Sequence, residues 1–372
     1  MDNAATTPVN DTVLETMMPY FNTFYGNPSS VYSLGQKSKE AIENSRFSIA
    51  HSLRCQPTEL YFTSGGTESD NWALKSSLIN SEKNHIITTS VEHPAILSTC
   101  RELEKQGLAD ITYLPVDSKG EITLEDVKKA IRKNTCLVSV MYANNEVGTI
   151  YPIEEIGEYC REKGILFHVD GVQALGNLSI RLDQLPVDMM SFSAHKIYGP
   201  KGIGLLYLRD GVELPSFIRG GEQERGKRGG TENVPLIVGF AKAVEMAVTY
   251  LEDHQRQMEK IRNYLWESLD SMEGIYINGP EKNRLPGNLN ISIENIKDQM
   301  ILPFLDMNGI CVSQGSACSA GSIEPSHVLY ALGRRGDLLK NSLRISVGYQ
   351  NTIKEAEEVI KAIQKGVTKF RK

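Results

Sequence analysis

Residues 189–204 read MMSFSAHKIYGPKGIG, and the rest of the chain is organised around the lysine in this stretch, Lys196. Its apolar first part has the character of a buried strand, and the glycine and proline residues after it break that strand. Lys196 is therefore expected at the rim of a sheet. A lysine in a desolvated pocket loses proton affinity and can form a Schiff base with an aldehyde cofactor such as pyridoxal phosphate (PLP). The alternative, a surface lysine beside a turn, does not explain why Ser193 and His195 precede it so closely.

Length and composition are typical of a globular protein with two domains. The 372 residues are 40% hydrophobic and 23% charged, which is enough to bury a large core. The formal net charge is -6 without long runs of one sign, which does not indicate a nucleic-acid partner. No apolar stretch is long enough to span a bilayer, and the N-terminus lacks the pattern of a signal peptide. We therefore expect a cytoplasmic protein without membrane contact.

The 6 cysteines are scattered without a CxxC pair, so neither a zinc site nor a disulfide framework is predicted. Most are expected to be buried, small apolar residues. Cys318 differs because it lies in residues 312–322, VSQGSACSAGS, which are mostly small or polar. This composition is typical of a mobile, exposed loop, where a thiolate can act as a nucleophile. His327 follows in sequence, but no GxSxG or papain-like signature accompanies it, which disfavours a hydrolase.

Short β-rich runs alternate with helix-like segments through the first two thirds of the chain. This alternation predicts an α/β fold with a mostly parallel, seven-stranded sheet covered by helices on both faces. Ligands of such sheets bind beyond the carboxyl ends of the strands, so functional residues are expected there. The predicted strands cover residues 59–62, 85–89, 111–114, 137–141, 165–169, 188–192 and 203–208.

The character of the chain changes near residue 252. Met258, Ile261, Leu265 and Leu269 recur at spacings that place them on one face of a helix. Strands and amphipathic helices follow. We predict a large domain over residues 12–252 and a smaller α+β domain over residues 253–372 that recruits residues 1–11. The later elements are expected at residues 289–293 and 343–347 (strands) and at 297–307 and 353–370 (helices).

Four polar clusters follow predicted strands, and each has a structural and a functional interpretation. Gly65-Gly66-Thr67 open a helix whose N-terminus can bind a phosphate, or they merely cap it. Asp170 can pair with a protonated ring nitrogen or cap a helix. His93 can stack on a flat ring and move protons, although a structural histidine is commoner. Asn144-Asn145 can orient ligand oxygens or form a turn. Because all four lie on the same rim, we expect one shared site.

A glycine-rich segment, RGGEQERGKRGGTEN, covers residues 219–233 and carries three arginines. It is flexible enough to bring donors to an anion, although a solvated loop has the same composition. No GxxxxGK[ST] match occurs in the chain, so a nucleotide-binding P-loop is disfavoured.

These motifs resemble those of the cysteine desulfurases of the NifS/IscS type, PLP enzymes of the class V aminotransferase superfamily with the type I fold. The resemblance runs from DNAATTP at residues 2–8 to the C-terminal helix. Its most specific parts are SFSAHK at residues 191–196, NNE at 144–146 and GSACS at 315–319.

The resemblance implies a role for each matching residue. Lys196 would hold PLP, and Asp170 would pair with its pyridine nitrogen. Catalysis would fall to Lys196, to His93 stacked on the ring, and to Cys318 as sulfur acceptor. Gln173 would donate a hydrogen bond to the ring oxygen. Asn145 and Arg344 would bind the substrate carboxylate, and Asn145 would also contact the cofactor. The residues around the phosphate would be Gly66, Thr67, Ser193, Ala194 and His195, with Thr231 of the partner subunit.

The implied activity is the removal of sulfur from L-cysteine by a homodimer, giving L-alanine and a persulfide on Cys318 for iron-sulfur clusters or tRNA thiolation. The partner would be a sulfur-acceptor protein, either an iron-sulfur scaffold or a tRNA thiolase. No metal site of its own is implied, although Cys318 could be a transient iron-sulfur ligand with a scaffold. A selenocysteine lyase and a class V aminotransferase share the PLP residues, and the second would not need Cys318. A silent scaffold subunit is opposed by the joint presence of Lys196, Asp170 and Cys318.

Overall fold

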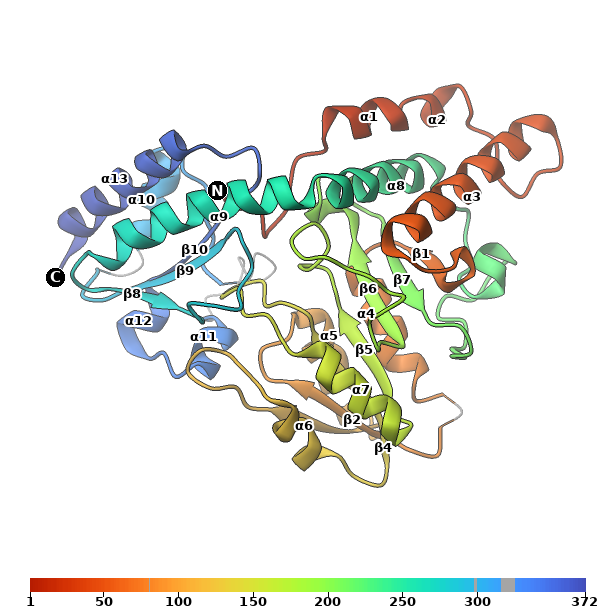
Figure 1. The fold of residues 1–372 in the computed structure, drawn as a ribbon, viewed down its shortest axis with the longest axis horizontal. Coiled ribbons are helices and arrows are strands. Elements are labelled where there is room, and N and C mark those ends of the chain that lie inside the picture. The colour runs from red at the N-terminus through yellow and green to blue at the C-terminus, as the bar shows by residue number, and fades with distance from the viewer. Residues whose placement is uncertain (80, 298–299, 316–324) are drawn as a thin grey trace.

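The computed structural model describes residues 1–79, 81–297, 300–315 and 325–372. These residues form two lobes, one built on a seven-stranded sheet and the other on a three-stranded sheet (Figure 1). The strands of the larger sheet are β1 (Leu60–Thr63), β2 (His85–Thr89), β3 (Asp110–Leu114), β4 (Thr135–Met141), β5 (Leu166–Asp170), β6 (Met189–Ser193) and β7 (Gly204–Leu208).

The order of the larger sheet is β1-β7-β6-β5-β4-β2-β3. Strand β7 runs antiparallel to both of its neighbours, and the other pairs are parallel. Each predicted strand is present within two residues of its predicted bounds, so the predicted α/β class with a mostly parallel sheet is confirmed. The carboxyl ends of β1, β2, β4, β5 and β6 therefore meet at one edge.

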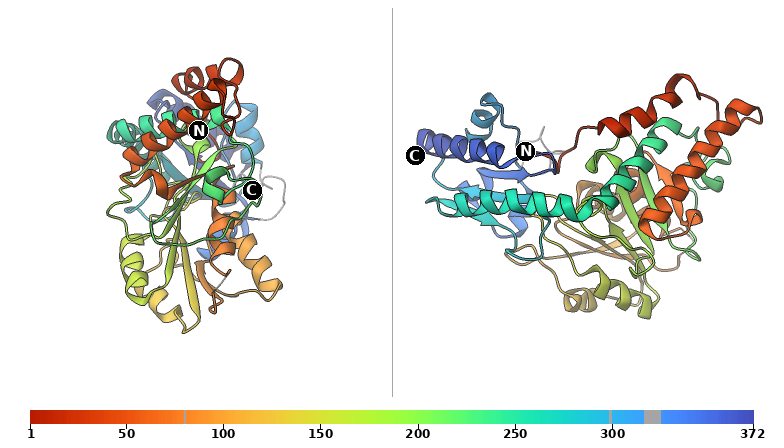
Figure 2. Two further views of the ribbon diagram at one scale, coloured as in Figure 1. Left: turned by 90° about the vertical axis from the view of Figure 1, so that its right-hand side faces the viewer. Right: turned by 45° about the horizontal axis from the view of Figure 1, so that its top comes forward.

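Helices cover both faces of this sheet, and Figure 2 shows α1 and α3 beside α8. Local signals set several of their ends: Thr123 and Asp126 form a capping box at the start of α6, and α7 ends at Gly164 in the left-handed conformation. The helices of this lobe are α1 (Asp11–Met17), α2 (Pro19–Asn22), α3 (Ser33–Leu53), α4 (Gly66–Ser76), α5 (Pro94–Lys105), α6 (Leu124–Ala130), α7 (Ile153–Lys163) and α8 (Val234–Thr249), with short 3-10 turns at Pro57–Glu59, Ala194–Lys196 and Gln223–Gly226.

The smaller lobe holds an antiparallel sheet of order β10-β9-β8. Met258, Ile261, Leu265 and Leu269 of α9 are all buried against it, as their spacing predicted. Strand β8 has no counterpart in the sequence prediction, because hydrophobicity does not follow burial in it: Tyr276 is exposed, whereas Asn278 is fully buried. The elements are α9 (Leu251–Asp270), β8 (Ile275–Asn278), β9 (Asn288–Ile293), α10 (Ile301–Met307), α11 (His327–Ala331), α12 (Gly336–Lys340), β10 (Ser342–Ser346) and α13 (Ile353–Phe370).

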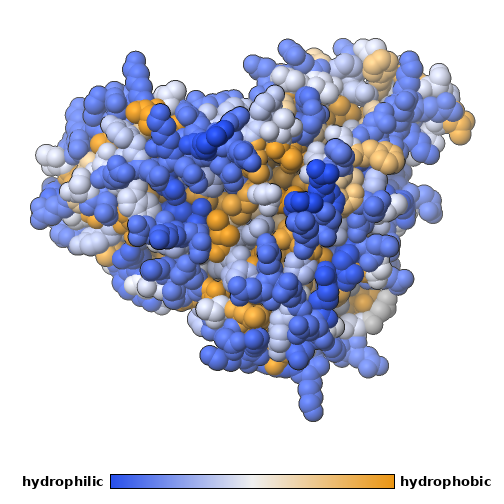
Figure 3. Space-filling view, in the orientation of Figure 1, coloured by the Kyte–Doolittle hydropathy of each residue, from blue (hydrophilic) through white to orange (hydrophobic). Residues whose placement is uncertain are grey.

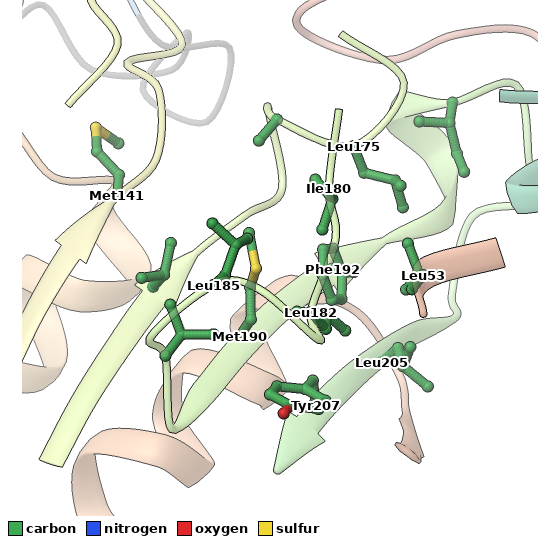
Figure 4. Close-up of a cluster of buried hydrophobic side chains, with 14 of the residues drawn as sticks. Leu53, Met141, Leu175, Ile180, Leu182, Leu185, Met190, Phe192, Leu205 and Tyr207 are labelled. Atoms are coloured by element: carbon green, nitrogen blue, oxygen red, sulfur yellow. The ribbon is translucent and has the colours of Figure 1, made fainter. Parts of the chain in front are cut away.

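The larger sheet separates two hydrophobic cores, because successive strand residues point to opposite faces. Met190 of β6 belongs to the core under α1, α3, α7 and α8, and Met189 belongs to the core under α4 and α5. Figure 4 shows part of the first core, with Phe192 and Leu205 among its members. Val328 and Leu329 of α11 join this core although they lie after residue 253. The division of the chain into domains at residue 252 stays a prediction.

No single helix among the described residues has the length and hydropathy needed to cross a membrane. Helices α8 and α9 meet the criterion only as a pair, and the chain bends by 72° between them. Nine residues of α8 are buried in the protein. On the face seen in Figure 3, hydrophobic side chains gather where the lobes meet and most of the remaining surface is hydrophilic.

The segment 219–233 is held more firmly than its composition predicted. Glu224 forms a buried ion pair with Arg46 of α3, with nitrogen to oxygen distances of 2.7 and 2.9 Å. Its Oε2 also accepts a hydrogen bond from the backbone N–H of Phe62 in β1. Arg228 pairs with Glu68 of α4, and Arg225 donates to the carbonyl oxygen of Leu60. Two of the three arginines thus have acceptors inside the chain, which sequence composition could not indicate.

We expect Glu224→Ala to lower the free energy of unfolding by about 3–5 kcal/mol, because it removes the buried counter-charge of Arg46 and leaves only the half-exposed carboxylate of Glu43, 3.5 Å from Nε. Thermal unfolding followed by circular dichroism measures the change. The matched control is Asp183→Ala, which breaks the exposed pair with Arg181 and should change stability by less than about 1 kcal/mol. Equal melting temperatures for the two variants would contradict the prediction.

Candidate active site

A cleft opens at the edge of the larger sheet where the parallel strands end. Most residues that the sequence singled out line this one cleft, as the strand-end argument requires. They are Gly66, Thr67, His93, Asn145, Asp170, Gln173, Ser193, His195, Lys196 and Arg344. Ala194 is buried and Thr231 is exposed, and neither is among the described lining residues. Cys318 lies outside the described residues.

The first residues of the chain form one wall of the cleft, and we name residues 2–7 the N-terminal strap. Lys196 lies on the 3-10 turn after β6, and its Nζ donates to the carbonyl oxygens of Ala4 and Ala5 at 2.6 and 2.8 Å. The strap is fixed alongside, since the backbone N–H of Thr7 donates to the carbonyl oxygen of His195. The amine of Lys196 is thereby held inside the cleft. Residues 2–8 belong to the family resemblance, but their contact with Lys196 was not predicted from the sequence.

A second cavity lies between the lobes and shares Ala4, Gln173 and Lys196 with the cleft. The rest of its lining is largely apolar or amide side chains, including Met246 of α8 and Met258 of α9. The carboxyl groups and the helix N-terminus that can bind a charged ligand face the cleft instead.

Three carboxyl groups are buried around the floor of the cleft. Burial raises the pKa of Asp170 to about 6, opposed by a hydrogen bond from the backbone N–H of Val172 and by the charge of Lys196. Burial raises the pKa of Glu92 to about 8. Burial, and secondarily the carboxyl of Asp170, also raises the pKa of Asp70 well above its ordinary value. Three anions so close together are unfavourable, so the negative charge concentrates on Asp170.

Asp70 is a lining residue that the sequence analysis missed. Its Oδ1 is buried without a hydrogen-bond partner in the described part of the chain, 3.6 Å from Nε2 of His168. Both ring nitrogens of His168 contact serine hydroxyls at 2.9 Å, and burial lowers its pKa to about 3, so the ring is neutral. Its spacing could have indicated its position, because Asp70 follows Gly66 by four residues and therefore lies on the same face of α4.

The N-terminus of α4 forms an anion site at one end of the cleft. The first N–H groups of a helix have no intrahelical acceptor and carry partial positive charge. Gly66 permits a close approach there, since a Cβ at this position would lie 2.6 Å from Cγ2 of Val172. Ser193 and His195 line the same part of the cleft. Burial, then the charge of Lys196, lowers the pKa of His195 to about 4.

His93 serves the fold and the cleft together. Its Nδ1 accepts a hydrogen bond from the backbone N–H of Ala95 and so caps α5. Burial, followed by the charge of Lys196, lowers its pKa to about 4, so the imidazole is neutral near pH 7. Since Nδ1 is an acceptor, the ring proton of this neutral form lies on Nε2. The structural and functional interpretations of this histidine are therefore compatible.

The two amides after β4 have different tasks. Oδ1 of Asn144 accepts hydrogen bonds from the backbone N–H groups of Glu146 and Val147, so this residue builds the turn. Asn145 faces the cleft beside Arg344. Arg344 is almost fully buried, and it already pairs with Asp2 of the strap at 2.9 Å.

We expect the melting temperature of the wild type to fall as pH rises from about 5 to about 8 more steeply than that of Glu92→Gln. Glu92 has a pKa of about 8 when folded and about 4.3 when unfolded, so folding takes up a proton in this window and stability declines across it. Glutamine resembles the protonated carboxyl and removes this contribution. Thermal melts at three pH values measure it, with the exposed Glu125→Gln as control. Parallel pH dependences for the wild type and Glu92→Gln would show the prediction to be wrong.

Known proteins are similar to this chain in sequence and in fold over its whole length. The family model described as Aminotransferase class-V matches residues 1–359. The chain is 47% identical over 373 residues to a cysteine desulfurase IscS of Methanosarcina thermophila, covering 100% of this chain and 92% of that protein. A solved structure named NifS-like protein has a TM-score of 0.93 at 40% identity and covers 99% of each chain. Another, titled SspA in complex with cysteine, has a TM-score of 0.82 at 39% identity and covers 94% of this chain and 99% of that one. The chain therefore belongs to the aminotransferase class-V family and, within it, to the cysteine desulfurases of the NifS/IscS type.

Proposed function

We propose that this chain removes sulfur from L-cysteine, releases L-alanine and keeps the sulfur as a persulfide on Cys318. The observation that carries the proposal is the convergence of Lys196, the buried carboxyl of Asp170 and the N-terminus of α4 on one cleft. Membership of the cysteine desulfurases supports the reaction, and the similar structure titled as a complex with cysteine supports the substrate.

The cleft fits PLP, on which this family depends. Gly66 and Thr67 would bind the phosphate at the N-terminus of α4, with Ser193 and His195 beside them, as the close approach at Gly66 allows. Asp170 would bind the protonated ring nitrogen at the other end, since a cation there offsets the burial of its carboxylate. When bound, PLP supplies an electron-withdrawing ring that makes the Cα proton of an amino acid acidic.

The remaining contacts follow from the positions of three side chains. Neutral His93 would stack on the ring, and Gln173, whose Nε2 donates to the carbonyl oxygen of Ala4, would turn toward the ring oxygen. Arg344 and Asn145 would bind the substrate carboxylate, which places Cα near the amine of Lys196. In its neutral form Nζ would accept the Cα proton, and as an ammonium group it would be held by the carbonyl oxygens of the strap.

Cys318 would take the sulfur as a nucleophile. A bond forms between its sulfur and that of the substrate, the Cβ–S bond of the substrate breaks, and the electron pair stays with the carbon skeleton, which gains a proton to become L-alanine. The contacts of residues 312–315, which precede Cys318, support its assignment as the nucleophile. Ser313 pairs through its backbone with Arg344, and a Cβ at Gly315 would lie 3.6 Å from Oε2 of Glu146, beside the turn that carries Asn145.

The proposal includes a homodimer and an acceptor protein. Thr231 is exposed on segment 219–233 and would complete the phosphate site of the partner subunit. Contiguous exposed apolar surface is typical of subunit interfaces. Large exposed hydrophobic side chains occur on α1 to α3 and the loop between them, namely Leu14, Met18, Phe21, Tyr25, Val31, Tyr32 and Phe47. The acceptor would be an iron-sulfur scaffold or a tRNA thiolase.

We expect the purified protein to be yellow and to release equal amounts of L-alanine and sulfide from L-cysteine with a thiol reductant. Lys196→Ala should lose both the colour and sulfide release, because no amine remains to hold PLP. Cys318→Ala should keep the colour and lose sulfide release by a factor of roughly 100 or more, because the nucleophile is gone.

The matched control is Lys105→Ala at the exposed end of α5, which should behave as the wild type. Undiminished sulfide release by Cys318→Ala would show that it is not the sulfur acceptor. An unchanged absorption spectrum of Lys196→Ala would show that another residue holds PLP.

A further inference from the structure

The ion pair between Asp2 and Arg344 lies in the wall of the cleft and joins residues 342 positions apart. Arg344 lies on β10 with its side chain only 1% exposed, and its Nη2 donates to Oδ1 of Asp2 at 2.9 Å. Its Nη1 donates to the carbonyl oxygen of Asn145 at 3.3 Å. A guanidinium buried this deeply needs a nearby anion, because an uncompensated buried charge is strongly unfavourable. Asp2 is that anion before substrate arrives.

Asp2 is itself held in place from the other side. Its Oδ2 accepts a hydrogen bond from the hydroxyl of Ser313 at 2.7 Å, so both carboxylate oxygens have partners. Ser313 and Arg344 exchange two backbone hydrogen bonds of 3.2 and 2.7 Å. The backbone of Asp2 forms a parallel bridge with Ser346 on the same strand. The position of the Asp2 carboxylate is therefore defined by β10, not by the strap alone.

The guanidinium retains donors for a second carboxylate. It has five N–H groups, and the contacts with Asp2 and Asn145 use two of them. Nε is buried without an acceptor among the described residues. Since Arg344 lines the cleft, its remaining donors can bind a ligand carboxylate without breaking the pair with Asp2.

We propose that Asp2 is a positioning residue for substrate recognition, which holds Arg344 toward the cleft so that the α-carboxylate of the amino-acid substrate can bind while the pair stays intact. This inference rests on the proposed function, because it takes Arg344 as the carboxylate-binding residue. The alternative is that Asp2 competes with the substrate carboxylate for Arg344. Removing a positioning carboxylate weakens substrate binding, whereas removing a competing carboxylate strengthens it.

The test is steady-state sulfide release from L-cysteine by the holoenzyme variants Asp2→Ala and Asp2→Asn. We expect Asp2→Ala to raise KM by roughly 10-fold, with kcat changed less than about 3-fold. Asp2→Asn keeps an oxygen acceptor for Arg344 and should fall between Asp2→Ala and the wild type. Ser313→Ala should raise KM in the same direction by a smaller factor. Asp11→Ala, an exposed carboxylate just after the strap, is the control and should match the wild type.

Binding of L-alanine, followed as a change in the visible absorption of the holoenzyme, separates recognition from chemistry. Its Kd should rise in parallel with KM in Asp2→Ala. An unchanged or lowered KM in both Asp2 variants would overturn the inference, and so would a loss confined to kcat. If Asp2→Ala does not fold, the KM of Asp2→Asn decides. A wild-type enzyme that releases no sulfide from L-cysteine would instead refute the proposed function, so the two failures are distinct.

Discussion

The hydrogen bonds from Nζ of Lys196 to the carbonyl oxygens of Ala4 and Ala5 are the contact on which the rest of the cleft depends. The same strap is fixed to the smaller lobe, because Asn3 donates to the carbonyl oxygen of Ser346 and Asp2 pairs with Arg344. One short segment therefore connects the amine after β6 with the guanidinium on β10. The two lobes contribute to one site because the strap lies between them.

Burial then decides how charge is distributed in the cleft. Asp70, Glu92 and Asp170 are all removed from water, which raises the pKa of each, and the nearby carboxyl of Asp170 raises those of Asp70 and Glu92 further. The pKa of Asp170, about 6, lies below that of Glu92, about 8, and Lys196 is nearby. A positively charged ring nitrogen would favour its ionised form further. The cleft thus offers the carboxylate of Asp170 and the N-terminus of α4, which suits a ligand that carries both a cation and an anion.

Much of the fold followed from local patterns. The seven strands of the larger sheet and the buried face of α9 match their predictions, because period-2 and helical spacings reflect which side of an element is buried. Strand β8 was missed, since it exposes Tyr276 and buries Asn278, the reverse of what their hydrophobicity indicates. The segment 219–233 was expected to be freer than it is. Its composition is that of a loop, but the pair between Glu224 and Arg46 joins residues from distant parts of the chain.

Local sequence patterns predicted the class of fold and placed Lys196, Asp170 and His93 on one rim of the sheet, where the cleft lies. They could do so because parallel strands end at one edge and polar residues at strand ends stand out against apolar runs. Three contacts became visible only in the folded chain: the strap holds Lys196, Asp70 lies beside Asp170, and Asp2 pairs with Arg344. These contacts cross from one element or lobe to another, and their energies depend on burial and distance, neither of which is recorded in the local order of residues.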